Sequence, residues 1–164
     1  MKRQLVEFAS IRFGVQAKAL DKGPIAFVQA SAINEGGAVE RDHVRRIAPE
    51  AVSFKPDDLL NADDVLLIGK GNENRAVVWP GSDEDTLASS TLYVIRTDPK
   101  QVLPAYLASY LNSTPAKAYF AFHQKAGTVK VLGRTALNEL MVPVPPLEHQ
   151  QRIVQLAASI QRSQ

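Results

Sequence analysis

The pattern of apolar and polar positions divides the chain near residue 100. Before that point, four apolar runs bounded by turn-forming residues predict β-strands. They are PIAFVQA at residues 24–30, DVLLIG at 64–69, RAVVWP at 75–80 and STLYVIR at 90–96. The glycine- and asparagine-rich stretch KGNEN joins the second run to the third, so these two strands are expected to form a hairpin. Nearer the N-terminus, Leu5, Phe8 and Ile11 predict a short amphipathic element that stops near Gly14.

Helical periodicity takes over after residue 100. The segment LPAYLASYLNS places four side chains on one helix face: Tyr106, Leu107, Tyr110 and Leu111. Thr114 and Pro115 predict the cap and the first position of a second helix. The residues expected along it are Ala116, Tyr119, Phe120 and His123.

The segment that follows predicts shorter elements. Residues 126–128 end the second helix, VKVL at 129–132 predicts a short strand, and Thr135 is expected to cap a last turn. The predicted fold is therefore α+β, a single domain with a mixed or antiparallel sheet and short helices, followed by an exit helix.

In the C-terminal stretch MVPVPPLEHQQRIVQL, a proline-rich segment is followed directly by apolar positions at helical spacing. Its prolines disfavour the α region in the residues before them, so residues 142–145 are expected to be extended. Pro146 is expected in the first turn of a helix, where Glu148 complements the helix dipole. A narrow apolar stripe, with Gln150 in line, follows: Leu147, Ile153, Val154, Ala157 and Ile160. Two interpretations stay open, a terminal helix packed on its own domain or a helix that leaves it and docks on a partner.

The composition suits a single globular domain in the cytoplasm. Of the 164 residues, 45% are hydrophobic and 22% charged, which is ordinary for a soluble protein. The N-terminal MKRQLVEF lacks the apolar core of a signal peptide, and no apolar run approaches the ~18 residues of a membrane span. The chain has no cysteine, which excludes disulfides and thiolate nucleophiles or ligands.

Charge is balanced overall but uneven along the chain. The net charge is +2, from 19 basic and 17 acidic residues, so composition alone does not indicate nucleic-acid binding. Between residues 100 and 134, however, there is no acidic residue. Five basic residues stand there: Lys100, Lys117, Lys125, Lys130 and Arg134. A basic binding face is one interpretation of this segment, and an ordinary solvated surface is the other.

Motifs of the common enzyme classes are missing. GKG at residues 69–71 is not a phosphate loop, since neither GxxxxGK[ST] nor GxGxxG occurs. His43, His123 and His149 have no companion ligands at metal spacing, and Ser89 has no GxSxG context. We therefore expect a binding module without catalysis, cofactor or metal, and keep an undetected hydrolase only as a third hypothesis.

Five segments, in order, resemble the target-recognition domain of type I restriction-modification specificity subunits. LVEFASIRFG resembles the opening helix of that family, and GPIAFVQASAINEGG resembles its first strand and turn. DDVLLIGKGN is similar to its strand with a glycine loop, although Asp64 stands where the family often has Gly-Asp. LASSTLYVIRTD is followed by LPAYLASYLNS, which is similar to the family's P-x-YL-x-x-x-LNS helix. The closest block is AGTVKVLGRTALNELMVPVPPLEHQQRIV, which ends in the signature vPlPPleeQ-x-xIv.

The resemblance implies a non-catalytic, sequence-specific subunit that directs a DNA methyltransferase and restriction complex. The partners it implies are double-stranded DNA, the modification (methyltransferase) subunit and the restriction subunit, with no membrane. It also implies a DNA target-recognition domain at residues 1–146, and at 147–164 the start of the helix that spaces two such domains in the family. About 18 helical residues span only ~27 Å. The chain is therefore either a half-length protein that pairs with a second copy through this helix, or a fragment of a longer one.

A DNA ligand requires cations at phosphates and amide or guanidinium groups at base edges. Two loops and one further position carry such groups: Lys70, Asn72, Asn74 and Arg75; Gln124, Lys125, Thr128 and Lys130; and Arg134. The other interpretation is that Asn72 and Asn74 serve only the turn and that the second loop is merely solvated. For the whole chain, the competing hypothesis is a non-catalytic interaction module that docks through its C-terminal helix without binding DNA.

Overall fold

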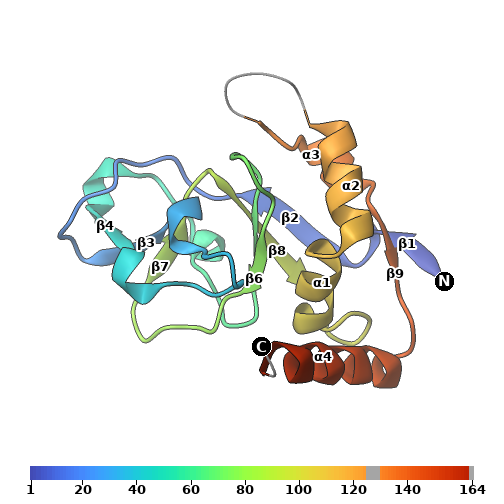
Figure 1. Ribbon diagram of the computed structural model, residues 1–164. Coiled ribbons are helices and arrows are strands. Elements are labelled where there is room, and N and C mark those ends of the chain that lie inside the picture. Colours follow the sequence, from blue (N-terminus) through green and yellow to red (C-terminus); the bar gives the residue numbers. More distant parts are fainter. Residues whose placement is uncertain (125–129, 163–164) are drawn as a thin grey trace.

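A four-stranded antiparallel sheet, in the order β2-β8-β5-β6, lies at the centre of the molecule. The computed structural model describes residues 1–124 and 130–162. Residues 161 and 162 are described by their backbone only. The strands of the central sheet are β2 (Ala9–Phe13), β5 (Val65–Ile68), β6 (Ala76–Val78) and β8 (Leu92–Thr97). Figure 1 shows a second sheet on one side of this central sheet and helices on the other.

Both faces of the central sheet are buried. Because side chains alternate along a strand, Val65 and Leu67 of β5 pack toward the helices, while Leu66 and Ile68 pack toward the second sheet. In β8, Tyr93 likewise packs toward the helices, and its neighbour Leu92 packs toward the second sheet. A strand covered on both faces has no polar side, which explains why these segments are continuous apolar runs.

The second sheet has three strands in the order β4-β3-β7. β3 (Ile25–Val28) pairs antiparallel with β4 (Arg45–Ile47) and parallel with β7 (Thr86–Ala88). Its own small core contains Ile25, Phe27, Ile47 and Leu87. The sheet arrangement is therefore mixed, as the sequence predicts.

The helical layer is built from the C-terminal part of the chain. α1 (Pro104–Leu111) and α2 (Thr114–His123) cover the central sheet, and α3 (Arg134–Asn138) follows. β9 (Met141–Pro143) then pairs antiparallel with β1 (Lys2–Gln4), which joins the two ends of the domain. α4 (Leu147–Arg162) runs across the bottom of the view in Figure 1.

The predicted α+β class is confirmed, and so is the hairpin, since β5 and β6 pair antiparallel. The N-terminal segment does not form the opening helix that the family resemblance implied. Leu5–Glu7 form one 3-10 turn, and Ala9–Phe13 form β2, paired with β8 along its whole length. Leu5, Phe8 and Ile11 are all buried, so the apolar positions are right. The spacing of three arises from a turn that leads into a strand.

Other boundaries shift by a residue or more. Ser113, and not Thr114, caps α2, and its hydroxyl accepts a hydrogen bond from the Ala116 amide. α3 begins at Arg134, so Gly133 takes the cap position expected for Thr135. Within the described part of the predicted strand at 129–132, Val131 makes an isolated bridge to Lys70. Ser113 stands directly before Thr114, and Gly133 lies two residues before Thr135, so each threonine has another residue nearby that suits a cap, and sequence alone does not choose between them.

α4 begins at Leu147, directly after Pro146, and its first half packs on its own domain. Gln150 is completely buried, and Val154 packs against the main core. Ile153, Leu156 and Ile160 are exposed, at 42%, 64% and 54%. The face with Gln150 and Val154 therefore packs on the chain's own domain. The docking interpretation concerns the other face, which is exposed. No helix within the described ranges is long and apolar enough to cross a membrane.

Candidate nucleic-acid interface

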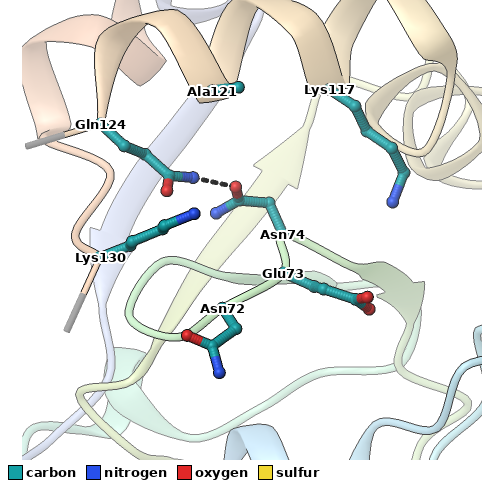
Figure 2. A pocket seen from close by; sticks show the side chains of 7 residues that line it. All are labelled: Asn72, Glu73, Asn74, Lys117, Ala121, Gln124 and Lys130. Atoms are coloured by element: carbon teal, nitrogen blue, oxygen red, sulfur yellow. Dashed lines mark hydrogen bonds between the residues drawn. The ribbon is translucent and has the colours of Figure 1, made fainter. Parts of the chain in front are cut away.

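A polar pocket of about 470 Å³ lies between the β5–β6 loop and α2. Figure 2 shows the side chains that line it. They are Asn72, Glu73, Asn74, Lys117, Ala121, Gln124 and Lys130. Three amides and two ammonium groups thus face one concave site, together with one carboxylate. These are the group types that contact base edges and phosphates.

The first half of the β5–β6 loop is held by backbone hydrogen bonds. The amides of Gly69 and Lys70 both donate to the Thr91 carbonyl, at 3.0 and 3.2 Å. The Gly71 amide donates to the Lys130 carbonyl at 3.0 Å, and the Leu132 amide donates to the Gly69 carbonyl at 2.8 Å. The loop is therefore fixed to the segment that follows residue 129.

Two glycines of this loop are required by the packing of the protein itself. A Cβ on Gly69 would lie 2.7 Å from the Tyr93 ring, and Gly71 has a φ of +153°. Residues other than glycine rarely adopt that backbone conformation. The contact with Tyr93 and the turn are therefore sufficient to explain these two glycines.

The second half of the loop is held by two side chains. Asn74 is only 8% exposed, and its Nδ2 donates to the Ile68 carbonyl at 2.8 Å. Arg75 donates to the Ile33 carbonyl at 2.9 Å and pairs with Glu73 at 2.6 Å. Both residues are therefore engaged within the protein. Between the two anchored halves, Asn72 and Glu73 form the exposed tip.

α2 supplies the opposite wall of the pocket. Lys117, Ala121 and Gln124 follow one another at spacings of four and three, so they share one helix face. Gln124 stands at the C-terminal cap, where its amide donates to the Phe120 carbonyl at 3.0 Å. Its side-chain Nε2 donates to Asn74 Oδ1, which joins the helix to the loop (Figure 2).

Lys70 and Arg134 lie on the β2 side of the loop. The Lys70 ammonium stands 4.9 Å from the centre of the Phe13 ring, and an Arg134 guanidinium nitrogen donates to the Ile11 carbonyl. Phe13 in turn stacks on Tyr93 with ring centres 3.9 Å apart. Burial raises the pKa of the Tyr93 phenol to about 12, and the positive charge of Arg134 opposes that shift.

The structure thus brings together four of the nine residues predicted to bind DNA: Asn72, Asn74, Gln124 and Lys130. Lys70, Arg75 and Arg134 lie around the pocket without lining it. Lys125 and Thr128 are outside the described residues. Lys117 was missed by the prediction, although its spacing from Gln124 on one helix face was a usable signal.

Lysines and arginines divide between two roles. Of the seven ion pairs among the described residues, six use an arginine, the seventh uses His43, and no lysine takes part. The most buried pair joins Arg96 to Asp64, a carboxylate that is 3% exposed. Six arginines are thus paired within the protein, while no lysine of the described residues has a carboxylate partner. Within the same ranges, no three histidines or carboxylates cluster as a metal site requires.

Comparison with known proteins gives one family. The family model described as "Type I restriction modification DNA specificity domain" matches residues 3–160. A search among curated proteins found no match.

Three solved structures share the fold. The S subunit of a type I restriction-modification system from M. genitalium superposes with a TM-score of 0.64 at 13% identity, over 97% of this chain and 38% of that chain. A structure on complex assembly and conformational transition of the type I R-M system gives 0.64 at 18%, over 99% and 38%. The HsdS subunit from Thermoanaerobacter tengcongensis gives 0.59 at 16%, over 99% and 37%. This chain therefore spans less than two fifths of the length of each.

Proposed function

The chain belongs to the family of type I restriction modification DNA specificity domains, and from this premise we propose that it selects the DNA sequence on which a type I restriction-modification complex acts. Specificity subunits of this family recognise DNA and are non-catalytic, so the chain is a recognition domain and not an enzyme. The methyltransferase and restriction activities belong to partner subunits. Its DNA ligand implies the cytoplasm as its location.

The pocket between the β5–β6 loop and α2 is the observation that carries this proposal. Asn72 and Gln124 supply amides for base edges, and Lys117 and Lys130 supply charges for phosphates. No lysine of the described residues is neutralised by an ion pair. The segment from residue 100 to 134 contains no acidic residue that would repel a phosphate. Asn74 and Arg75 act in this proposal by holding the loop, and Lys70 and Arg134 extend the basic surface toward β2.

Salt dependence is the direct test of DNA binding. If about five phosphates are neutralised, a log–log plot of the binding constant against salt should have a slope of about −4 to −5. The double variant Lys117→Ala and Lys130→Ala should reduce the slope by about two. Lys22→Ala removes an exposed lysine from the β2–β3 connection and should leave both affinity and slope unchanged.

The competing hypothesis predicts a different result in the same titration. A module that docks only through α4 would show no salt-dependent affinity for duplex DNA. It would still bind its protein partner, and the lysine variants would have no effect on that binding.

We also propose that residues 1–146 form the recognition domain and that 147–164 form a docking helix. The exposed side of α4, with Ile153 and Leu156 at its centre, supports this assignment. Its proposed partners are the same helix of a second copy and the modification subunit, with the restriction subunit joining the complex. Leu147 is half-buried, and Val154 and Ala157 face the chain's own domain, so Ile153 and Ile160 remain from the predicted docking set.

A further inference from the structure

The orientation of the Gln124 amide is fixed by two hydrogen bonds in series. The first begins at the Ile68 carbonyl, which can only accept. Asn74 must therefore turn its Nδ2 toward Ile68, at 2.8 Å, and this leaves its Oδ1 as the free end.

The second hydrogen bond follows from the first. Because Asn74 Oδ1 can only accept, Gln124 must turn its Nε2 toward it. Gln124 Oε1 then points away from Asn74, as Figure 2 shows. What Gln124 offers to a ligand is this acceptor together with the second hydrogen of its Nε2.

This orientation is locked by burial. Asn74 is 8% exposed, and Ile68 is held by its own amide, which donates to the Arg75 carbonyl at 3.0 Å. Reversing the Asn74 amide would bring its Oδ1 against the Ile68 carbonyl oxygen. Two acceptor oxygens that face each other in a buried site, with no donor between them, are strongly unfavourable. Asn74 therefore keeps its orientation, and Gln124 is held in one orientation by its hydrogen bond to Asn74.

The bases differ in what they present to such a group. In the major groove adenine offers the N6 donor beside the N7 acceptor, whereas guanine offers two acceptors, N7 and O6. An oxygen acceptor beside an N–H donor complements adenine and opposes guanine O6. Resting on the function proposed above, we infer that Gln124 recognises an adenine and that Asn74 is the positioning residue that excludes guanine.

The test uses the full chain and duplexes selected from a random pool. The position at which Gln124→Ala loses its preference is the position that Gln124 contacts. There the wild-type chain should prefer adenine over guanine by roughly ten-fold or more. Replacing that adenine by purine, which lacks N6, or by 7-deazaadenine, which lacks N7, should weaken the wild-type chain and leave Gln124→Ala unchanged.

Asn74 is tested by its effect on discrimination. Asn74→Ala should reduce the adenine preference by more than it reduces the affinity for random duplex, because the Gln124 amide is then free to reverse while Lys117 and Lys130 remain. If Asn74→Ala instead weakens binding equally at every position, with a lower melting temperature, Asn74 is merely structural and the inference is overturned.

The outcomes separate this inference from the function on which it rests. A guanine preference at the Gln124 position, or indifference to both adenine analogues, overturns the inference alone. Sequence preference that is unaffected by Gln124→Ala does the same. Absence of any salt-dependent DNA binding overturns both.

Discussion

Tyr93 connects the base of the β5–β6 loop with the segment after residue 129. Its phenol donates to the Leu132 carbonyl at 2.7 Å, and its ring stacks on Phe13, above which Lys70 lies. Burial raises the pKa of the phenol to about 12. The hydrogen bond to Leu132 therefore persists throughout the neutral pH range.

The free energy of unfolding should decrease as the pH rises from about 10 to about 12. In that window the unfolded phenol, with a pKa of about 10, has lost its proton while the folded one keeps it. Raising the pH thus favours the unfolded state, by up to about 2.7 kcal/mol for this group. Denaturant titrations at a series of pH values would measure the slope. Tyr93→Phe should make it shallower without removing it, because burial also raises the pKa of the other three tyrosines.

Residue chemistry predicted the site only in part. Asn72 and Asn74 are the same residue type two positions apart, yet one is exposed at the loop tip and the other is buried against the Ile68 carbonyl. Arg75 is bound to the carbonyl of Ile33, which lies 42 residues earlier in the chain. Contacts of that range decide which polar groups are available to a ligand, and no local pattern contains them.

At the scale of elements, the contacts of Asn112 and Ser113 explain the Leu-Asn-Ser sequence at the end of α1. The Asn112 amide accepts from the Ala76 amide and donates to the Ala76 carbonyl, both at 2.9 Å. β6 is the edge strand of the central sheet, so Asn112 covers backbone groups that would otherwise be open to pairing. The next residue, Ser113, caps α2. Two adjacent residues thus tie α1 to the sheet and start the following helix.

Replacing Asn112 by Ala should lower the free energy of unfolding by about 1–2 kcal/mol, since two hydrogen bonds to one residue are lost. Asn72→Ala is the matched control, because Asn72 is exposed at the loop tip, and it should leave stability unchanged. Chemical denaturation of the three proteins provides the comparison. Equal stability of the Asn112 variant and the control would mean that water replaces both hydrogen bonds.

Gln150 is the glutamine of the vPlPPleeQ-x-xIv signature, and it fastens α4 to the domain. It is fully buried, accepts from the Leu103 amide, and donates to the carbonyls of Gln101 and Pro145, each at 2.9 Å. All the hydrogen bonds of this side chain stay within the chain. These hydrogen bonds therefore fix the first turn of the helix against the domain.

Gln150→Leu should be strongly destabilising, by about 3 kcal/mol or more, because three buried backbone groups lose their partner. Gln151→Leu, at an exposed neighbouring position, should have little effect. Thermal unfolding gives the two values, and hydrogen exchange along α4 would show whether the helix detaches first. A Gln150 variant as stable as Gln151→Leu would contradict this account.

At the level of elements, sequence predicted the central strands and both main helices well. The strands are buried on both faces and therefore stand out as continuous apolar runs, while the helices are buried along one face and therefore show a clear helical periodicity. β1, β9, β4 and β7 were missed because three-residue strands carry almost no periodicity and depend on partners distant in sequence. The helix implied for the N-terminal segment is wrong for the same reason, as β2 is defined by its pairing with β8.

For the whole molecule, the two proposed functional surfaces lie at opposite ends. In Figure 1 the outer end of α2, where the pocket lies, is at the top, and α4 crosses the bottom. A partner that covers the exposed side of α4 therefore leaves the pocket accessible to DNA. If that partner is a second copy, the two pockets are related by two-fold symmetry, and a symmetric, split target is expected.

The double variant Ile153→Asp and Leu156→Asp should abolish association through α4 while the domain stays folded. Two charges in an apolar interface oppose association by several kcal/mol. Size-exclusion chromatography with light scattering, at several concentrations and with or without the modification subunit, would follow the mass. Gln155→Asp introduces one Asp at an exposed position that lies between Ile153 and Leu156 in the sequence, and this control variant should associate normally. A wild-type chain that stays monomeric and ignores the modification subunit would leave α4 as an ordinary terminal helix.

The way in which the β5–β6 loop is held has a consequence for how its specificity changes in evolution. The hydrogen bonds that tie the loop to the rest of the domain belong to residues 69–71, Asn74 and Arg75, and the tip adds only the exposed ion pair of Glu73 with Arg75. Substitutions at Asn72 and Glu73 should therefore be nearly neutral for folding, while they would alter the groups that the proposed interface presents to DNA. A library randomised at these two positions should consist largely of folded proteins with different target preferences. New specificities are then reachable by single substitutions, without an intervening unstable ancestor.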